Sequence, residues 1–566
     1  MRCCGPGNSL FKREESVADR TNPTIDPSSR PRRRRWLRIL AVIGFVAFLL
    51  AAAAFTVFAI YFRRAEPILR KRVIDTLATR YDSRVELDSF GVSVWQGFEV
   101  TGGGLRLYPN QLDSQQPLFS VDEFSFRATW HDLFRSPMHI GVVRISGLDI
   151  HLPPKGERGN MPRLDTRGGK KPGKIEMVVD RLDIRHASLI LGTNKPGKVP
   201  LDFEIVNLLM ASVGSGKPLL FRATLVNAKP IGNIDSSGSF GPFNAESPGD
   251  TAVSGIYSFT HADLGPLKGI GGMLSSTGRY EGTLNNITVD GETDTPDFTL
   301  DIVGHPVPLH TKFHAIVDGT NGDTHLEPVD AELLHSHILA RGDVVTVPGR
   351  GHDITLDVTL QPGRIEDLLA LGVKTQPPIM SGSLVLHTRL SLPPGKESVT
   401  DKLRLQGNFD ITNAHFSNDK VQDRIDELSL RSQGHADEAQ QVAKQDMNAN
   451  IASDMKGNFI LGNNKITITG LHYTVPGAHI AMNGVYSLDG EVFDFHGTAR
   501  LDAKVSQMVT GWKSLLLKPV DPFFSKNGAG TEVPIQITGT RSDPHFGLDF
   551  HRKDDKGKDP KGNRAP

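Results

Sequence analysis

Apolar and polar residues alternate with a period of two over most of the chain that follows Arg84. In a β-strand, this period places successive side chains on opposite faces, so each such segment predicts a half-buried strand with one apolar face. The clearest case is a hairpin with its turn at Asp489–Gly490. Its apolar faces carry Ile480, Met482, Gly484, Tyr486 and Leu488, and then Phe493, Phe495, Gly497, Ala499 and Leu501. About twenty segments of this kind predict a mainly β protein.

Few segments have the spacing of a helix. An amphipathic helix is expected over residues 65–82, and shorter helices at Arg364–Leu371, Ala436–Gln445 and Lys504–Leu517. The Gly-, Pro- and Lys-rich stretch Pro153–Lys174 is expected to be a loop.

A sheet of about twenty strands, spaced about 4.8 Å apart, is on the order of 100 Å long. Strongly twisted sheets of this size curl, split or flatten. A sheet that curls with its apolar face inward forms a trough, and lipid chains are a natural filling for such an exposed apolar surface. A sheet that splits instead packs its apolar faces together as ordinary sandwiches. Periodicity alone does not decide between these two folds.

A short pattern with apolar residues at positions i, i+3 and i+5 occurs at Val121–Arg127, Val179–Arg185 and Ile425–Arg431. These positions do not share one face of a regular strand, so a bulge or a strand entry at the second residue is needed to reconcile them. The pattern either marks successive strands of an extended β array or is a chance similarity.

An apolar run without charged residues precedes the alternating region. Its ends and flanks are Trp36, Arg38, Ile39, Phe62 and Arg63. As a helix the run spans roughly 36 Å, enough to cross a hydrocarbon core of about 30 Å. A retained signal-anchor is expected rather than cleavage near Ala51–Ala54 or Ala59, because a signal peptide has a shorter apolar region. The arginines before the run favour a cytoplasmic N-terminus.

The chain has 64 basic and 64 acidic residues, so its formal net charge is +0. Nucleic-acid-binding domains are usually basic, and nucleic acid is therefore not expected as a partner. The two cysteines, Cys3 and Cys4, precede the apolar run. The alternating region therefore has no disulfide and no thiolate metal site.

No motif points to catalysis or to a cofactor. Gly214–Pro218 resembles a phosphate loop but lacks its first glycine and its hydroxyl residue. His310 and His314 share a strand face, as do His335 and His337, but a metal site needs a third ligand. We interpret them as solvent-facing strand residues. The chain has no Gly-x-Ser-x-Gly elbow and no His-Glu-x-x-His helix, and a non-enzymatic protein without cofactors is expected.

Several segments resemble the AsmA family of bacterial envelope proteins. One sign is the order of a short tail, an apolar run, an amphipathic helix and the strand opening Ser83–Val94. The strongest signs are C-terminal: Val475–Gly490, Phe493–Gly497, Trp512–Lys518, Asp521–Phe524, Val533–Gly539 and Pro544–Gly547. Together they resemble the AsmA-like C-terminal region over residues 470–550.

The resemblance implies one N-terminal transmembrane helix, an amphipathic helix, and a long, curled, mostly antiparallel β-sheet that forms an elongated apolar groove. The expected parts are a disordered cytoplasmic tail (1–36), a signal-anchor helix (37–63), a linker helix (64–83), a periplasmic β-groove (84–470), the AsmA-like region (471–550) and a disordered tail (551–566). The protein would cross the bacterial inner (plasma) membrane once, with most of the chain in the periplasm.

The implied function is to shield phospholipid acyl chains for transport or homeostasis between the inner and outer membranes. The expected partners are these acyl chains, the inner membrane and outer-membrane or periplasmic proteins. The candidate groove-lining residues are Phe298, Leu300, Ile302, Phe313, Leu356, Val358, Ile466, Ile468, Ile480, Met482, Tyr486, Phe493 and Phe495. The alternative is an assembly or scaffolding factor for outer-membrane proteins that acts by strand pairing at the sheet edges.

Overall fold

The computed structural model describes residues 48–53, 67–79, 81–94, 97–110, 116–133, 136–154, 177–192, 200–214, 216–244, 247–267, 269–300, 305–347, 349–373, 376–445, 449–488, 491–509, 530–540 and 543–548. The chain divides into two compact units, Met1–Arg72 and Val73–Pro566. Residues 48–53 are helical, and so are residues 67–79, within the expected amphipathic helix. Across the described ranges, no helix combines the length and apolar character needed to cross a membrane. The expected anchor residues Trp36, Arg38, Ile39, Phe62 and Arg63 lie outside the described residues.

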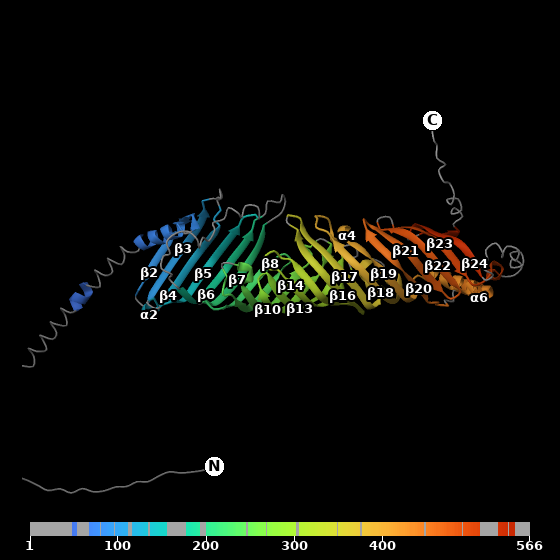
Figure 1. Ribbon diagram of the computed structural model, residues 1–566, viewed down its shortest axis with the longest axis horizontal. Coiled ribbons are helices and arrows are strands. Elements are labelled where there is room, and N and C mark those ends of the chain that lie inside the picture. The colour runs from blue at the N-terminus through green and yellow to red at the C-terminus, as the bar shows by residue number, and fades with distance from the viewer. Residues whose placement is uncertain are drawn as a thin grey trace, which may run out of the picture. The chain divides into compact units, whose positions relative to one another are not determined.

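The second unit is built on one sheet of 25 strands, coloured from blue to red along its length in Figure 1. The first strands are β1 (Ser83–Glu86), β2 (Ser89–Ser93), β3 (Phe98–Pro109), β4 (Phe119–Ala128), β5 (Met138–Leu152), β6 (Met177–Leu191), β7 (Leu201–Val213), β8 (Leu219–Ala228), β9 (Ile231–Phe240), β10 (Ala252–Asp263), β11 (Ile270–Gly271) and β12 (Met273–Thr283). The later strands are β13 (Asn286–Leu300), β14 (Val307–Val317), β15 (Thr324–Leu333), β16 (Ser336–Val347), β17 (Gly351–Arg364), β18 (Met380–Leu392), β19 (Arg404–Phe416), β20 (Ser453–Gly462), β21 (Lys465–Val475), β22 (Ala478–Ser487), β23 (Val492–Leu501), β24 (Thr531–Thr540) and β25 (Pro544–Leu548). The sheet is long and curled open, which confirms the mainly β fold.

Strands that follow one another in the chain pair antiparallel along almost the whole sheet. At the start β1 and β2 both pair with β3, and in the middle β10 pairs with β12 while β11 extends the end of β13. Among the described strands the parallel pair is β5 with β6. A parallel pair needs a long crossover connection. The expected loop Pro153–Lys174 falls between the end of β5 and the start of β6, which accounts for its length.

The ends of the strands form two long edges that run along the sheet, distinct from its outermost strands. We call edge 1 the side with the β12–β13, β16–β17, β18–β19 and β20–β21 connections, and edge 2 the side with the β10–β12, β17–β18, β19–β20 and β21–β22 connections. Edge 1 carries α2 (Trp130–Leu133), η2 (Pro248–Asp250) and α4 (Val399–Lys402). Edge 2 carries α3 (Ile365–Gly372), α5 (Asp419–Ser432), α6 (Ala436–Gln445) and η3 (Val505–Met508).

Two of the three short helices expected from the sequence are confirmed. Helix α6 has the expected bounds, and α3 differs from its expected range by one residue at each end. Of the third expected helix, Lys504–Leu517, the described part forms only the 3₁₀ turn η3, and residues 510–517 lie outside the described residues.

The first two copies of the short repeat lie in strands, whereas the third does not. In β4, Asp122 is missing from the ladders on both sides, opposite Gly104 and Gly147, which take φ values of 66° and 65°. This interruption at the second residue brings Val121 and Phe124 into one apolar cluster, as the sequence required. The strand interpretation of Ile425–Arg431 is wrong, because this segment lies in α5. Asn418 caps that helix, and Glu427 and Arg431 pair at 2.8 Å across one turn.

Candidate functional site

We call the concave face of the sheet, on which α3 and α5 pack, the inner face. One inner-face residue from each strand between β2 and β24, β11 excepted, forms a continuous line across the sheet. We call this line the central row. It consists of Phe90, Gly102, Phe124, Ile145, Ile184, Leu208, Ala223, Ser236, Tyr257, Gly278, Gly291, Phe313, Val329, Ala340, Val358, Thr388, Gly407, Phe459, Ile468, Gly484, Phe495 and Ile537. Every member is buried or half-buried, and none is ionisable at neutral pH.

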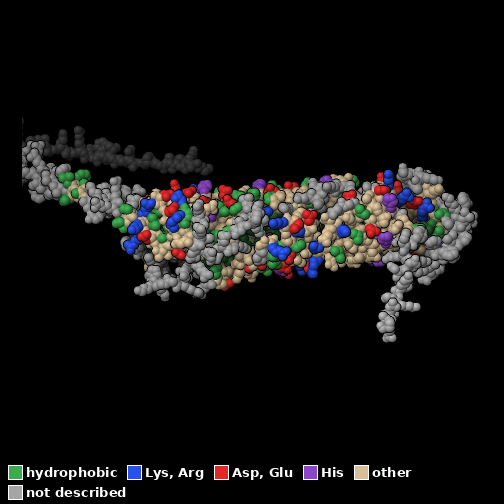
Figure 2. Space-filling view, turned by 90° about the horizontal axis from the view of Figure 1, so that it is seen from above, with side chains coloured by type: hydrophobic (Ala, Val, Ile, Leu, Met, Phe, Trp, Pro, Cys, Tyr) green, Lys and Arg blue, Asp and Glu red, His purple; other side chains and the backbone are tan. Residues whose placement is uncertain are grey.

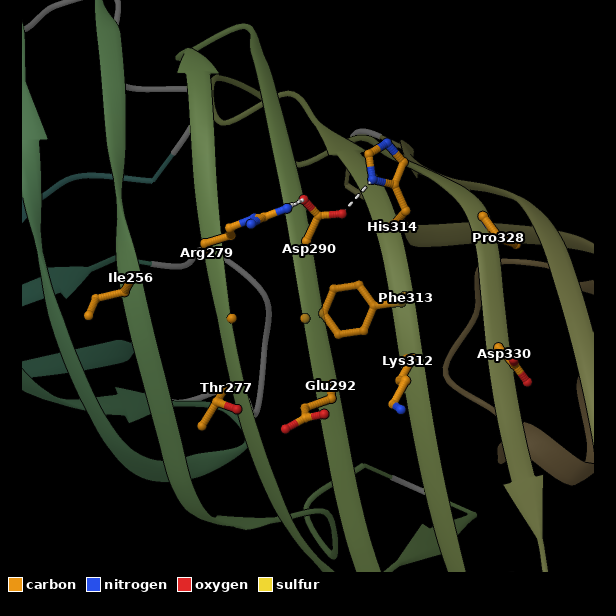
Figure 3. Close-up of a pocket in the computed structure, with 12 residues that line it drawn as sticks. Ile256, Thr277, Arg279, Asp290, Glu292, Lys312, Phe313, His314, Pro328 and Asp330 are labelled. Carbon is orange, nitrogen blue, oxygen red and sulfur yellow. Dashed lines mark hydrogen bonds and ion pairs between the residues drawn. The ribbon is translucent and has the colours of Figure 1, made fainter.

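The residues next to the central row in each strand face the other way, and in β12, β13 and β14 most of them carry charges. Asp290 lies between Arg279 at 3.2 Å and His314 at 2.7 Å, across three neighbouring strands (Figure 3). The hydrogen bond from His314, together with the contact to Arg279, lowers the pKa of Asp290. These residues line an open cavity of ≈ 590 Å³ together with Glu292 and Lys312. In the space-filling view, charges of both signs are interspersed along the second unit (Figure 2).

Aromatic rings lie flat over glycines in the central part of the inner face. Tyr257 is paired with Gly278, where a Cβ would lie 2.7 Å from the tyrosine ring. One step along the same strands, Gly255 is paired with Tyr280, where a Cβ would lie 2.6 Å from the hydroxyl. Phe313 covers Gly291 in the same way. Only glycine leaves room for these rings against the backbone.

The polar atoms of this inner surface are paired with each other. The Tyr257 hydroxyl lies 3.1 Å from that of Ser276, and the Tyr280 hydroxyl lies 2.8 Å from that of Ser236. The hydroxyls of Thr293 and Thr311 lie 2.6 Å apart. Because these groups are paired, the surface presents few open hydrogen-bonding groups to an apolar occupant.

Helix α5 covers the inner face near edge 2 at the C-terminal end of the sheet. Its Ile425 packs with Val475 and Ala478 in a buried cluster. The buried carboxylate of Asp426 accepts hydrogen bonds from the Asn450 and Ile451 backbone N–H groups at 2.8 and 2.9 Å, which ties the chain after α6 to α5. Burial raises the pKa of Tyr473, a neighbour of this cluster, to about 12.

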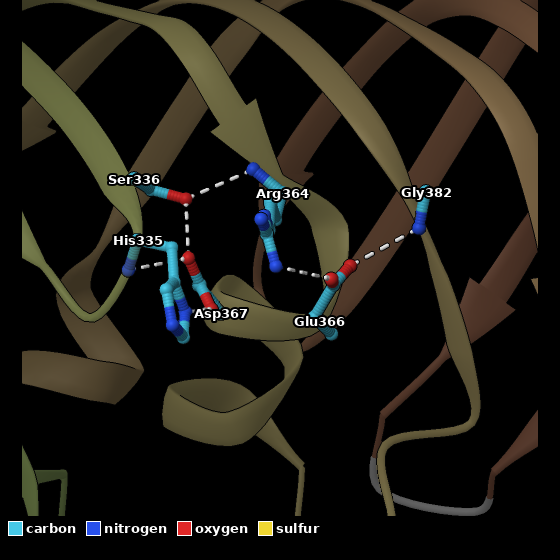
Figure 4. Close-up of polar contacts among 6 residues, drawn as sticks. All are labelled: His335, Ser336, Arg364, Glu366, Asp367 and Gly382. Carbon is cyan, nitrogen blue, oxygen red and sulfur yellow. Dashed lines mark hydrogen bonds and ion pairs between the residues drawn. The ribbon is translucent and has the colours of Figure 1, made fainter.

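Helix α3 packs against β16–β20 near the same edge. Its Ile365 and Leu368 pack on the buried Leu360 and Leu384. The buried Asp367 accepts hydrogen bonds from the Ser336 hydroxyl at 2.7 Å and the His335 backbone N–H at 3.0 Å (Figure 4). Helix α3 also contacts β13, four strands before β17 in the sheet, so the sheet is concave on this side.

The structure places the sequence-derived candidates on the inner face in three settings. Phe313, Val358, Ile468 and Phe495 belong to the central row, while Leu356, Ile466, Tyr486 and Phe493 lie nearer edge 1. Ile480 packs against the cluster under α5, and Met482 and Phe495 are only 4% and 7% exposed. Phe298 and Leu300 pair with Val307 and Ile270 at the end of β13, and Ile302 lies outside the described residues.

Two parts of this inner face were not among the sequence-derived candidates. One is the stretch from Phe124 to Leu208, and the other is the Tyr257–Tyr280 pair with its glycines. Alternation was present in both, but the irregularity at Asp122 and the small residues weakened it.

The histidines singled out by sequence lie beside carboxylates. His314, His310 and His337 lie 2.7, 3.8 and 3.3 Å from Asp290, Asp294 and Asp330. Within the described ranges, no three His, Cys, Asp or Glu side chains are placed to hold a metal ion. In comparisons with known proteins, no family model, curated protein or solved structure matches this chain.

Proposed function

We propose that this chain is a non-enzymatic bacterial envelope protein that holds lipid acyl chains on its inner face, as the resemblance to the AsmA family implies. The observation that supports this proposal is the central row, which crosses the sheet from β2 to β24 without an ionisable side chain. Burial of a methylene group is worth about 0.8 kcal/mol, so such a surface lowers the cost of moving an acyl chain through water. The mechanism is replacement of solvent by protein, without covalent chemistry.

The proposal includes the location of the protein. The apolar run Ile39–Phe62 anchors it in the inner membrane, with the N-terminus in the cytoplasm and the sheet in the periplasm. Phospholipids shielded by the sheet are then transported between the inner and outer membranes, or their amounts in the two membranes are kept in balance. Direction and energy come from partner proteins, because an apolar surface by itself favours neither.

A second candidate function is assembly of outer-membrane proteins by strand pairing. It is favoured by β25, for which the described residues supply one neighbouring strand, β24. An open strand edge can accept a further strand from another chain. This function needs a free edge but does not need an accessible inner face.

Lipid analysis of the purified full-length chain tests the proposal. The inner-face variant combines Phe313→Asp with Val358→Asp. The control combines Ile316→Asp with Leu339→Asp, two apolar residues of the opposite face that are 37% and 41% exposed. We expect the inner-face variant to carry at least about tenfold less co-purifying phospholipid than the control, because a charge in an apolar surface opposes an acyl chain.

Thermal unfolding of both variants separates the explanations. A folded inner-face variant with normal lipid content would overturn the proposal. An unfolded one would instead mean that these side chains are packed as an ordinary core. Lipid-free wild-type protein that retains binding to unfolded outer-membrane proteins would favour the strand-pairing function.

A further inference from the structure

The two long edges of the sheet meet where the β10–β12 connection contacts α4. The connection between β10 and β12 lies on edge 2, and α4 lies on edge 1 between β18 and β19. A Cβ built on Gly269 of this connection would lie 2.8 Å from the Val399 Cβ and 2.9 Å from the Val399 nitrogen. The Gly269 backbone therefore touches the first residue of α4, although the seven strands β12 to β18 lie between these two connections in the sheet.

Both sides of this contact are ordered by their own hydrogen bonds. We call residues 264–267 and 269–272 the strap. The Leu264 N–H bonds to the Gly272 carbonyl at 3.0 Å, and Ile270 and Gly271 pair with Leu300 and Thr299 at the end of β13. On the other side, Ser398 caps α4 by accepting from the Asp401 N–H at 3.2 Å.

The contact closes the curled sheet into a ring. Strands β12–β18 form its wall, and the strap and α4 join its two edges. Helix α3, which touches β13, β17 and β18, lies on the concave side of that wall. The central row passes through this section from Gly278 to Thr388.

We propose that the contact between Gly269 and Val399 is a gate, which must part before a lipid with a polar headgroup passes along the inner face. This inference rests on the proposed function. In an open trough, the headgroup travels in water on the open side while the chains lie on the apolar face. In the ring, the headgroup meets the joined edges, because an apolar interior does not accept its charges.

The residue at the contact suits this role. Gly269 takes a φ of 100°, a conformation that glycine adopts without strain, and its missing side chain leaves room for Val399. Neither Gly269 nor Val399 belongs to a strand ladder, so the two edges can separate here without breaking one.

A reversible disulfide tests the gate. The two native cysteines are first removed by Cys3→Ser and Cys4→Ser. Gly269→Cys and Val399→Cys are then introduced in this background. A disulfide holds the two Cβ atoms about 3.5–4.5 Å apart, so residues 269 and 399 need to move only slightly apart for the disulfide to form. The full-length chain is reconstituted in phosphatidylethanolamine–phosphatidylglycerol vesicles that contain radiolabelled phospholipid. A photoreactive residue replaces Phe124 on one side of the ring or Phe459 on the other.

In the reduced variant, we expect labelled lipid to crosslink at both positions. In the oxidised variant, we expect crosslinking at Phe459 to fall at least about tenfold while that at Phe124 persists, because the joined edges stop the headgroup. The same molecule before and after reduction is its own folding control. Equal crosslinking at Phe459 in both states would overturn the gate while leaving the proposed function in place. If the reduced protein gave no crosslinks at Phe124 and none at Phe459, both the gate and the proposed function would be overturned.

Discussion

The inner face is a buried core under α5, at the C-terminal end of the sheet, and a half-buried surface around the rings of β10, β12 and β14. Under α5, Val475 and Ala478 are 1% and 0% exposed. In the middle, Tyr257, Tyr280 and Phe313 remain half-buried and lie over glycines. Both regions arise from the same alternation of apolar and polar residues. At the C-terminal end, α5 packs on this apolar face and contributes Ile425 to the core, whereas the rings of β10, β12 and β14 pack on glycines of the sheet itself.

The largest effect is expected from a charge placed under α5. Val475→Asp puts a carboxylate among Ile425, Ala499 and Leu501, where it has no partner, and we expect a loss of about 3–5 kcal/mol in the free energy of unfolding. The control is His479→Asp on the exposed face of the neighbouring strand. Urea unfolding of the two variants measures the contrast. Equal stability would mean that α5 does not seal this region.

A smaller loss is expected where a ring covers a glycine. In Gly484→Ala the new Cβ meets the Phe495 ring, and we expect a loss of about 1–3 kcal/mol from overpacking. Gly372→Ala at the end of α3 is the control, because nothing lies within 4 Å of a Cβ there. If thermal unfolding shows no difference between the two, the ring does not need the glycine surface.

Removal of one hydroxyl from the middle surface should cost less still. Tyr280→Phe leaves the ring over Gly255 but removes the 2.8 Å contact with Ser236, for an expected loss of about 0.5–1.5 kcal/mol. Ser236→Ala removes the same contact together with the 3.0 Å hydrogen bond that Ser236 donates to the Ile256 carbonyl, so the double variant should cost little more than Ser236→Ala alone. Full additivity would show that the two groups do not interact.

The outer face should give the smallest effect, and it should depend on pH. The hydrogen bond to Asp343 at 2.6 Å raises the pKa of His325, so the protonated form stabilises the fold. That contribution is complete below the unfolded pKa of about 6.5 and is lost as the pH rises through the higher folded value. The stability difference between wild type and Asp343→Asn should therefore shrink between about pH 6 and pH 9. A gap that widens with pH would contradict this pairing.

The sequence predicted the strands well because alternation records which face of each strand is apolar. It placed the hairpin of β22 and β23, the helix α6 and the irregularity at Asp122. It could not show that Ile425–Arg431 is helical, since apolar residues three apart fit a helix as well as an interrupted strand.

Distant contacts were beyond the reach of the sequence pattern. Ile480 was expected to line the groove, and it alternates as expected, but α5 packs beside it. The contact of Gly269 with Val399 joins residues far apart in the chain, and it follows from the curl of the sheet rather than from local spacing. The central row likewise depends on the register of every strand pair.

The most direct test compares two neighbouring apolar residues on opposite faces of β20. Phe459 belongs to the central row, whereas Ile460 points the other way and is 52% exposed. A photoreactive residue is placed at each position in turn in the full-length chain, in bacterial membranes, and crosslinked lipid is measured by mass spectrometry. We expect phospholipid adducts at position 459 and few at position 460. Equal labelling at both positions, or labelling at 460 alone, would contradict the claim that the inner face holds lipid.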